Sequence, residues 1–301
     1  MAFSAAGSPK TTARGRLVFE TSFRIVCTAA VLFGFVVLCF LAQQLIKDGW
    51  GSLSFKFLES PPSSNYPERA GIYPALMGTI WLMGLILILT VPLGIGSAIY
   101  LEEFAPRNGF TRIIQLNITN LAGVPSIVYG LLGVAAFGFA AEATGSQDLR
   151  KSLLAGAVTM SLMILPLVIT ASQEALKAVP RYHREGSLAL GATRWEMISR
   201  IVIPSAIPGM MTGIILGLSR AIGEAAPLIT LGAVTYLTFS PRGPLDLYSV
   251  LPIQIFDWAQ RPEQIFQREK SAAAIIVLMG VLLLFNAAAI FLRSAARKRL
   301  H

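Results

Sequence analysis

Six long apolar stretches constrain this chain more than any other feature of its sequence. They cover residues 22–46, 74–100, 117–141, 153–172, 209–235 and 272–292. Each is long enough to cross the hydrocarbon core of a bilayer as a helix, which takes about 20 residues. Because a segment inside lipid must satisfy its own backbone hydrogen bonds, we expect helices. The sequence predicts an all-α polytopic membrane protein with six transmembrane helices.

The composition supports the same class. Hydrophobic residues make up 54% of the chain and charged residues only 14%, whereas a soluble domain carries roughly 25% charged residues. A chain of this kind cannot cover a water-facing surface, which excludes soluble, disordered and disulfide-rich secreted proteins. We expect a transmembrane domain over residues 22–292, with a loose tail at 1–21, a basic tail at 293–301 and no appended soluble domain.

The charge distribution predicts the orientation. There are 15 Lys and Arg residues in the segments 1–24, 101–116, 173–208 and 293–301, and 9 in the opposite loops. Lys and Arg gather on the cytoplasmic side of membrane proteins, so we expect both termini in the cytoplasm. The net charge of +9 is then an orientation signal, and no nucleic-acid partner is expected.

Prolines fall inside four of the six stretches and are absent from the first and the last. They are Pro92, Pro125, Pro166 and Pro227. An interior proline frees a backbone carbonyl and bends its helix. This pattern favours a four-helix translocating core with two peripheral helices, although membrane helices also tolerate proline without any functional reason.

The segment 173–208 is too long for a turn and too charged to enter the membrane. Its pattern predicts two short amphipathic helices hinged at Gly191, where glycine permits the positive φ that ends a helix. Apolar residues such as Leu188 and Trp195 stand among charges in this segment. Exposed apolar residues of this kind indicate a surface on which a partner docks.

The spacing within this segment resembles the EAA loop of ABC importer permeases. The matching positions are Glu185, Gly191 with Ala192 beside it, Ile201 and Pro204. The resemblance implies a bundle like that of the type I ABC importer permeases, and a cytoplasmic coupling loop that fits a groove on an ATPase subunit. The alternative is a solvated amphipathic loop that only caps the bundle.

This chain departs from the family pattern at two places. It has Gly186 and Ser187 where the family has two alanines, and Ile203 where the family has leucine. The spacing is kept throughout, and the replacements are similar in size.

The chain lacks the motifs of a catalytic or metal site. It contains no Gly-x-x-x-x-Gly-Lys phosphate-binding loop, no His-Glu-x-x-His zinc signature and no Ser-centred nucleophile elbow. The two histidines, His183 and His301, are expected to be solvated. We therefore predict a transporter subunit that is not an enzyme, with no catalytic residue, no metal and no cofactor of its own. ATP and Mg²⁺ would be used by the partner ATPase.

Arg220 and Glu224 are charged residues inside the fifth apolar stretch. A charge near the centre of a membrane helix costs about 2.5–3.5 kcal/mol on insertion scales. At positions i and i+4 the two side chains can reach each other on one face of a helix. We expect them to contribute to the substrate pathway, since a planar guanidinium suits an oxyanion; the alternative is an internal salt bridge.

A ridge of small residues runs along the same stretch. Gly209, Gly213, Gly217, Ala221 and Ala225 recur at four-residue steps. Small residues at this spacing allow close approach of a second helix, so we expect the three glycines to form a helix–helix contact.

Several segments resemble the phosphate-importer permeases more narrowly. They are residues 219–229, with Arg220 and Glu224, and residues 78–80, 91–106 and 124–133. The similarity covers most of residues 72–292 and favours the PstA type of subunit over the PstC type. It implies a PstC-like second permease subunit, two copies of a PstB-like ATPase and an external PstS-like phosphate-binding protein, in the plasma (inner) membrane of a bacterium.

Other functions remain compatible with the residues alone. The same machine could carry another oxyanion, such as molybdate or sulfate. An ion-coupled secondary carrier would use Arg220 and Glu224 as a titrating pair, and an assembly or sensing subunit would not transport at all. The outer loop 236–270 is compatible with a short interfacial helix that meets the binding protein or with a simple cover of the bundle.

Overall fold

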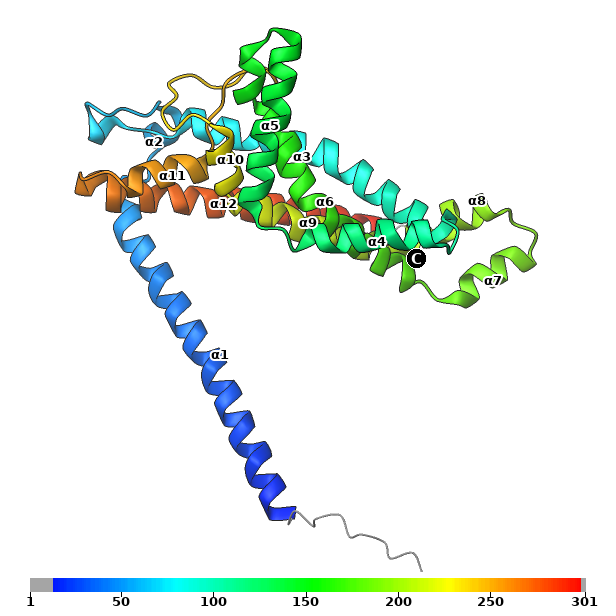
Figure 1. Ribbon diagram of the computed structural model, residues 1–301. Helices are drawn as coiled ribbons and strands as arrows, with labels where there is room; N and C mark the ends of the chain where they lie inside the picture. The colour runs from blue at the N-terminus through cyan, green and yellow to red at the C-terminus, as the bar shows by residue number, and fades with distance from the viewer. Residues whose placement is uncertain (1–12, 299–301) are drawn as a thin grey trace, which may run out of the picture.

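The protein is described here by a computed structural model covering residues 13–298; residues 1–12 and 299–301 of the expected tails lie outside this range. Over the described residues the chain is almost entirely helical (Figure 1). Its only extended pairing in that range is an isolated bridge between Ser152 and Leu247. Six helical segments of the described chain are long and apolar enough to cross a membrane: Phe19–Ser52, Pro67–Phe104, Ser126–Thr144, Leu153–Lys177, Arg194–Gly223 and Ile265–Phe291. The prediction of an all-α protein with six transmembrane helices is confirmed.

The α-helices follow one another with short connections. Their bounds are α1 Ala13–Gly49, α2 Phe55–Glu59, α3 Tyr73–Ile99, α4 Gly109–Ala122, α5 Ser126–Thr144, α6 Leu153–Lys177, α7 Arg181–Ala189, α8 Arg194–Met197, α9 Ile203–Gly223, α10 Ala226–Leu231, α11 Leu251–Ala259 and α12 Ser271–Lys298. Wider π turns occur at Tyr100–Phe104, Ile198–Val202 and Ile265–Lys270. Tight 3₁₀ turns occur at Trp50–Ser52, Pro67–Arg69 and Gln147–Lys151.

Helix α6 lies at the centre of the bundle. It packs against α3 and against α9, and α9 in turn packs against α12. The core between these helices is apolar, with Met160, Ile164 and Val168 of α6 meeting Ile86 of α3 and Ile214 of α9. Because lipid is as apolar as these side chains, close packing holds the helices together and exclusion from water contributes little.

The prediction that residues 117–141 form one spanning helix is wrong. The chain breaks at residues 123–125 into α4 and α5, and only α5 is long and apolar enough to span. Pro125 is the N-cap of α5, and a residue that precedes proline is disfavoured in the helical region. The proline therefore separates two helices here, while Pro92 and Pro166 lie inside continuous helices.

The fifth spanning helix begins and ends earlier than predicted. The helical run starts at Arg194 and passes through the π turn Ile198–Val202 into α9, which ends at Gly223. Pro204 lies in the first turn of α9, directly after this π turn, and having no N–H it donates no hydrogen bond to the turn before it. Pro227 begins α10. The stretch 209–235 is thus the end of one helix, a break and a second short helix.

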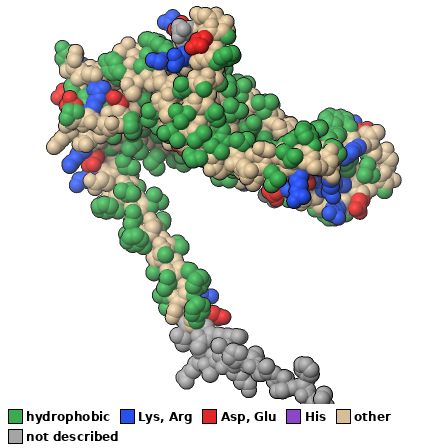
Figure 2. All heavy atoms as spheres, in the orientation of Figure 1, with side chains coloured by type: hydrophobic (Ala, Val, Ile, Leu, Met, Phe, Trp, Pro, Cys, Tyr) green, Lys and Arg blue, Asp and Glu red, His purple; other side chains and the backbone are tan. Residues whose placement is uncertain are grey.

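Helix α1 leaves the bundle instead of lying against it (Figure 1). It begins at Ala13, inside the segment expected to be a loose tail. The membrane-length window of its span has none of its residues buried, and hydrophobic side chains cover the described part of the helix (Figure 2). Its contact with the bundle is near its C-terminal end, where Gly49 approaches the backbone of Ala272 and Ala273 in α12.

The two ends of the bundle are different. Helices α7 and α8 lie at one end, together with the C-terminal end of α12, and α2 and α11 lie at the other (Figure 1). Basic side chains gather near α7 and α8 (Figure 2). Helix α11 forms inside the outer loop as a short helix and buries Leu251, Ile253 and Trp258 against the bundle.

Candidate functional site

Arg220 and Glu224 lie where two broken spans meet. Arg220 is in the last turn of α9 and its side chain is exposed. Glu224 follows the helix with an extended backbone, at φ −97° and ψ 110°. Its Oε1 accepts a hydrogen bond of 2.7 Å from Oγ of Ser126, the first residue of α5. The N-terminus of a helix also favours a carboxylate electrostatically.

No ion pair joins Arg220 and Glu224 among the ion pairs of the described residues, so the internal salt bridge that was the alternative to a pathway role does not form within this chain. The prediction assumed one continuous helix, whereas α9 ends at Gly223 and turns the Glu224 side chain toward α5. Sequence reasoning missed Ser126, although its place directly after Pro125 marks a helix start.

Arg220 lies near Tyr129 of α5, where α5 and α10 pack closely together. Its guanidinium lies close enough to Tyr129 of α5 to act on it electrostatically, and the Tyr129 hydroxyl donates 2.8 Å to the carbonyl oxygen of Leu121. Helices α5 and α10 approach closely here, because a β-carbon added at Gly130 would lie 1.8 Å from Oγ1 of Thr230. This region thus has an exposed guanidinium with five N–H donors and, four residues further along the chain, a carboxylate held by a hydroxyl.

The glycine ridge of α9 faces α6. A β-carbon added at Gly213 would lie 2.4 Å from Cβ of Ala171, and one added at Gly209 would lie 2.6 Å from Cβ of Ala175. At Gly217 the nearest atom, Cγ2 of Val168, would be 3.1 Å away. Only glycine permits this separation at the first two positions.

The segment that resembles an EAA loop has the hinged geometry expected from its sequence. Gly191 adopts φ +86° between α7 and α8, which an L residue with a side chain rarely adopts. Helix α8 starts with a capping box in which Thr193 and Glu196 satisfy each other's backbone N–H groups. We call residues 181–202 the coupling unit.

The other predicted residues of this segment are distributed along the coupling unit and the start of α9. Glu185 is exposed on α7, and Ala192 follows the hinge, its N–H donating 3.1 Å to the carbonyl oxygen of Ser187. Ile201 lies in the π turn Ile198–Val202, and Pro204 lies beyond it in α9.

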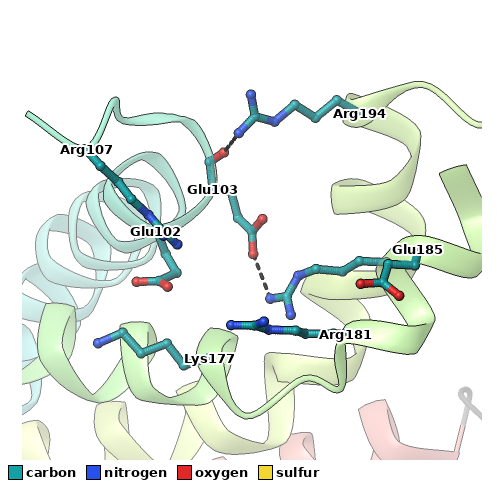
Figure 3. Close-up of a pocket in the computed structure, with 8 residues that line it drawn as sticks. Glu102, Glu103, Arg107, Lys177, Arg181, Glu185 and Arg194 are labelled. Atoms are coloured by element: carbon teal, nitrogen blue, oxygen red, sulfur yellow. Dashed lines mark hydrogen bonds and ion pairs between the residues drawn. The ribbon is translucent and has the colours of Figure 1, made fainter.

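A charged hollow of about 550 Å³ separates the coupling unit from the end of α3 (Figure 3). Arg184 of α7 spans it and donates 2.9 Å to Oε1 of Glu103, which follows α3. From α8, Arg194 donates to the backbone carbonyl of Glu103. Sequence reasoning missed this cluster, because a single sequence does not say which of several loop arginines meets an acid at the end of a span.

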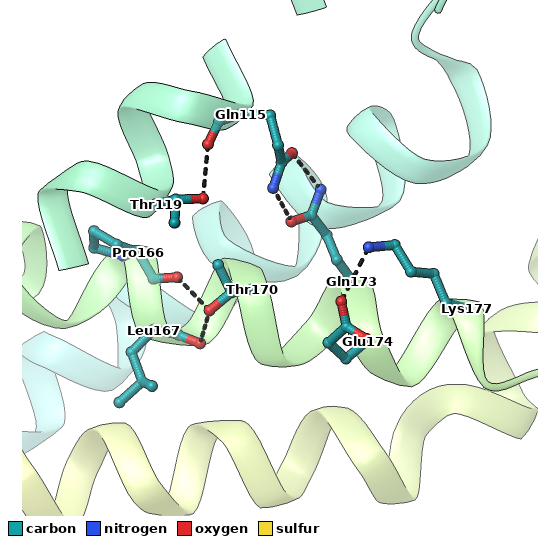
Figure 4. Close-up of polar contacts among 8 residues, drawn as sticks. All are labelled: Gln115, Thr119, Pro166, Leu167, Thr170, Gln173, Glu174 and Lys177. Carbon is teal, nitrogen blue, oxygen red and sulfur yellow. Dashed lines mark hydrogen bonds and ion pairs between the residues drawn. The ribbon is translucent and has the colours of Figure 1, made fainter. Parts of the chain in front are cut away.

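A second polar contact braces α4 against α6 (Figure 4). The side-chain amides of Gln115 and Gln173 exchange two hydrogen bonds of 2.9 Å, and Gln173 is only 3% exposed. Because both amide groups are satisfied by each other, the pair fixes the position of α4, which has no buried residue of its own.

The sequence matches a known family over most of its length. The family described as binding-protein-dependent transport system inner membrane component matches residues 90–300. The probable ABC transporter permease protein YqgI of Bacillus subtilis is 32% identical over 285 residues, covering 90% of this chain and 92% of that protein. The phosphate transport system permease protein PstA 1 of Mycobacterium tuberculosis is 33% identical over 292 residues, covering 93% and 88%.

Solved structures agree on the fold. A chain of a bacterial alginate ABC transporter, solved with an alginate pentasaccharide-bound periplasmic protein, superposes with a TM-score of 0.64 at 15% identity. The superposition covers 93% of this chain and 96% of that chain. The bundle is therefore of the ABC importer permease type. This chain belongs to the family of binding-protein-dependent transport system inner membrane components, as a permease subunit of an ATP-driven importer.

Proposed function

We propose that this chain is one of two permease subunits of an ATP-driven phosphate importer in the plasma (inner) membrane of a bacterium. The observation that carries the proposal is the exposed guanidinium of Arg220 at the junction of two broken spans, beside Glu224. An arginine in this position gives an oxyanion a bidentate partner in a membrane that otherwise excludes charge. The similarity to phosphate transport permeases along nearly the whole chain supports phosphate as that oxyanion.

The coupling unit would dock on the ATPase. Glu185, Gly191 and Ala192 lie on it or at its hinge, and Ile201 and Pro204 connect it to α9. The side chains of Tyr182, Leu190 and Trp195 are apolar and exposed at this end, as a docking surface requires. ATP and Mg²⁺ are used by the ATPase dimer, and this chain needs no cofactor. Both termini and the coupling unit are assigned to the cytoplasm.

The exposed face of the Arg220 site would be completed by the second permease subunit. Phosphate would arrive from an external binding protein that docks at the end of the bundle formed by α2 and α11. Tight selection belongs to that binding protein, and this subunit holds phosphate only in passage.

Uptake of radiolabelled phosphate by proteoliposomes that contain the complete importer, the binding protein and enclosed ATP tests the proposal. We expect ATP-dependent uptake that is absent when the ATPase is omitted. Uptake driven by an ion gradient without ATPase would favour a secondary carrier. Uptake of sulfate or molybdate in place of phosphate would assign a different oxyanion as the substrate. ATP hydrolysis without any uptake would favour a sensing subunit.

A further inference from the structure

Both helices of the coupling unit contact the same short element, the π turn Tyr100–Phe104 that ends the α3 span. Arg184 reaches it from α7 and Arg194 reaches it from α8. The hinge at Gly191 lies between these two contacts. The coupling unit is thus fastened to α3 on both sides of its own hinge.

The contact from α7 is a largely buried ion pair. The Glu103 side chain is 9% exposed and that of Arg184 is 20% exposed, with 2.9 Å between Oε1 and Nη2. Arg184 also donates 2.8 Å to the carbonyl oxygen of Leu176 and 2.7 Å to that of Val179. Leu176 is in the last turn of α6, where its carbonyl also accepts from the N–H of Val179, and Val179 directly follows the helix. One guanidinium therefore ties together α3, α6 and α7.

The contact from α8 uses the backbone and an aromatic side chain. Arg194 donates to the carbonyl oxygen of Glu103 and lies over the ring of Phe104, 5.5 Å from its centroid. Phe104 in turn meets the ring of Trp195, with 6.4 Å between centroids. A wide turn leaves carbonyls free to accept such bonds, and π turns within helices are frequent at functional sites.

We propose that Glu103 is a positioning residue of the transport cycle, and that its ion pair with Arg184 carries displacements of the coupling unit into α3. We call this pair the α3 latch; the inference rests on the proposed function of the coupling unit. Without the latch, a displacement enters the bundle through α9, which continues directly from α8. With the latch, α3 and α9 move together on the two sides of α6.

The test compares Glu103→Gln with Glu102→Gln in the complete importer. Glu102 is the neighbouring, half-buried carboxylate and makes no ion pair among those of the described residues. The measured quantity is phosphate transported per ATP hydrolysed, with the amount of bound ATPase determined in the same preparation. For Glu103→Gln we expect this ratio to fall about tenfold, a typical coupling between distant sites, at an unchanged amount of bound ATPase. Glu102→Gln should match the wild type.

Reversing the charges separates a latch from a purely structural role. Glu103→Arg and Arg184→Glu each place like charges together, and we expect each to lose coupling or assembly. The double reversal restores an attractive pair but not the two donations to the carbonyls of Leu176 and Val179. We therefore expect a ratio above that of either single reversal and below that of the wild type, since the effects of paired residues are not additive. If Glu103→Gln alone prevents assembly, the double reversal takes its place as the test. Recovery of both bound ATPase and the transport ratio supports the latch, and recovery of bound ATPase alone contradicts it.

The latch is wrong if Glu103→Gln keeps the wild-type ratio, or if the ratio of the double reversal does not exceed that of both single reversals. A failure of the proposed function is visible separately, because the wild-type importer would then move no phosphate. The same variants would in that case be compared on whichever oxyanion the wild type transports.

Discussion

Arg184 and Arg220 are two arginines near the ends of spanning helices, and their surroundings differ. Arg184 bonds to a carboxylate and two backbone carbonyls of its own chain. Arg220 is exposed, and no hydrogen bond or ion pair of its side chain occurs among those of the described residues. The chain completes the first arginine's site and leaves the second incomplete. A complete site suits the transmission of force, and an incomplete one suits a ligand that comes and goes.

The largest effect is expected at the incomplete site. Arg220→Gln removes the guanidinium charge that attracts an anion at this site and should lower phosphate uptake on the order of 100-fold, the size of effect that the loss of one charge-stabilising donor has in an enzyme. Uptake by proteoliposomes with enclosed ATP measures this. Arg112→Gln, at an exposed position of α4, is the control and should be neutral. Unchanged uptake and ATPase coupling in Arg220→Gln would remove this arginine from the pathway.

The packing between the two sites gives the next effect. Arg184 binds a carbonyl in the last turn of α6, and Arg220 is part of α9. The glycine ridge is the packing contact between these two helices. Gly213→Val forces Cβ against Ala171 and should destabilise the bundle by about 1–3 kcal/mol. Gly84→Val is the matched control, because nothing lies within 4 Å of its added Cβ. The midpoints of thermal unfolding in detergent compare the two variants. Equal midpoints would show that α6 and α9 can move apart at the ridge without loss of stability.

The next effect concerns the hinge at Gly191, in the coupling unit that contains Arg184, and is measured as binding of the ATPase. Gly191→Ala strains the backbone at φ +86° by about 1 kcal/mol, which corresponds to roughly fivefold weaker binding of the ATPase. Gly186→Ala lies in α7, where an added Cβ meets nothing within 4 Å, and should bind normally. Binding of purified ATPase to permease variants in nanodiscs measures both. Equal affinities would exclude a role for the hinge in docking.

The smallest effect is expected at Ser126, which holds Glu224 near the Arg220 site by a single hydrogen bond. Ser126→Ala removes the 2.7 Å hydrogen bond to Glu224, and we expect uptake to fall about threefold, because water can replace a hydroxyl at a half-exposed carboxylate. Ser205→Ala, an exposed serine of α9, is the control. An effect as large as that of Arg220→Gln would mean that Ser126 binds the substrate directly.

The sequence predicted the presence of the spanning helices better than the residues at which they begin and end. Hydrophobic runs located all six spans, and glycine chemistry located the hinge at Gly191, because both are local properties. The same runs continued across Pro125 and Gly223, where the helices stop, since hydrophobicity does not distinguish one helix from two. Helical spacing placed Arg220 and Glu224 on one face, whereas the break after Gly223 turns Glu224 toward Ser126. The ion pair of Glu103 was not predictable from the sequence, because its partner Arg184 lies 81 positions away.

Helix α1 shows that stability and membrane insertion are separate requirements in this chain. Since its membrane-length window buries no residue against the bundle, its side chains add almost no cohesion to the other helices. Substitutions among its Leu, Val and Phe residues should therefore be silent in the melting of the isolated subunit, provided that hydrophobicity is kept. The surface of this window therefore has to suit whatever covers it in the membrane, lipid or a neighbouring helix, and is free of the packing demands of the core.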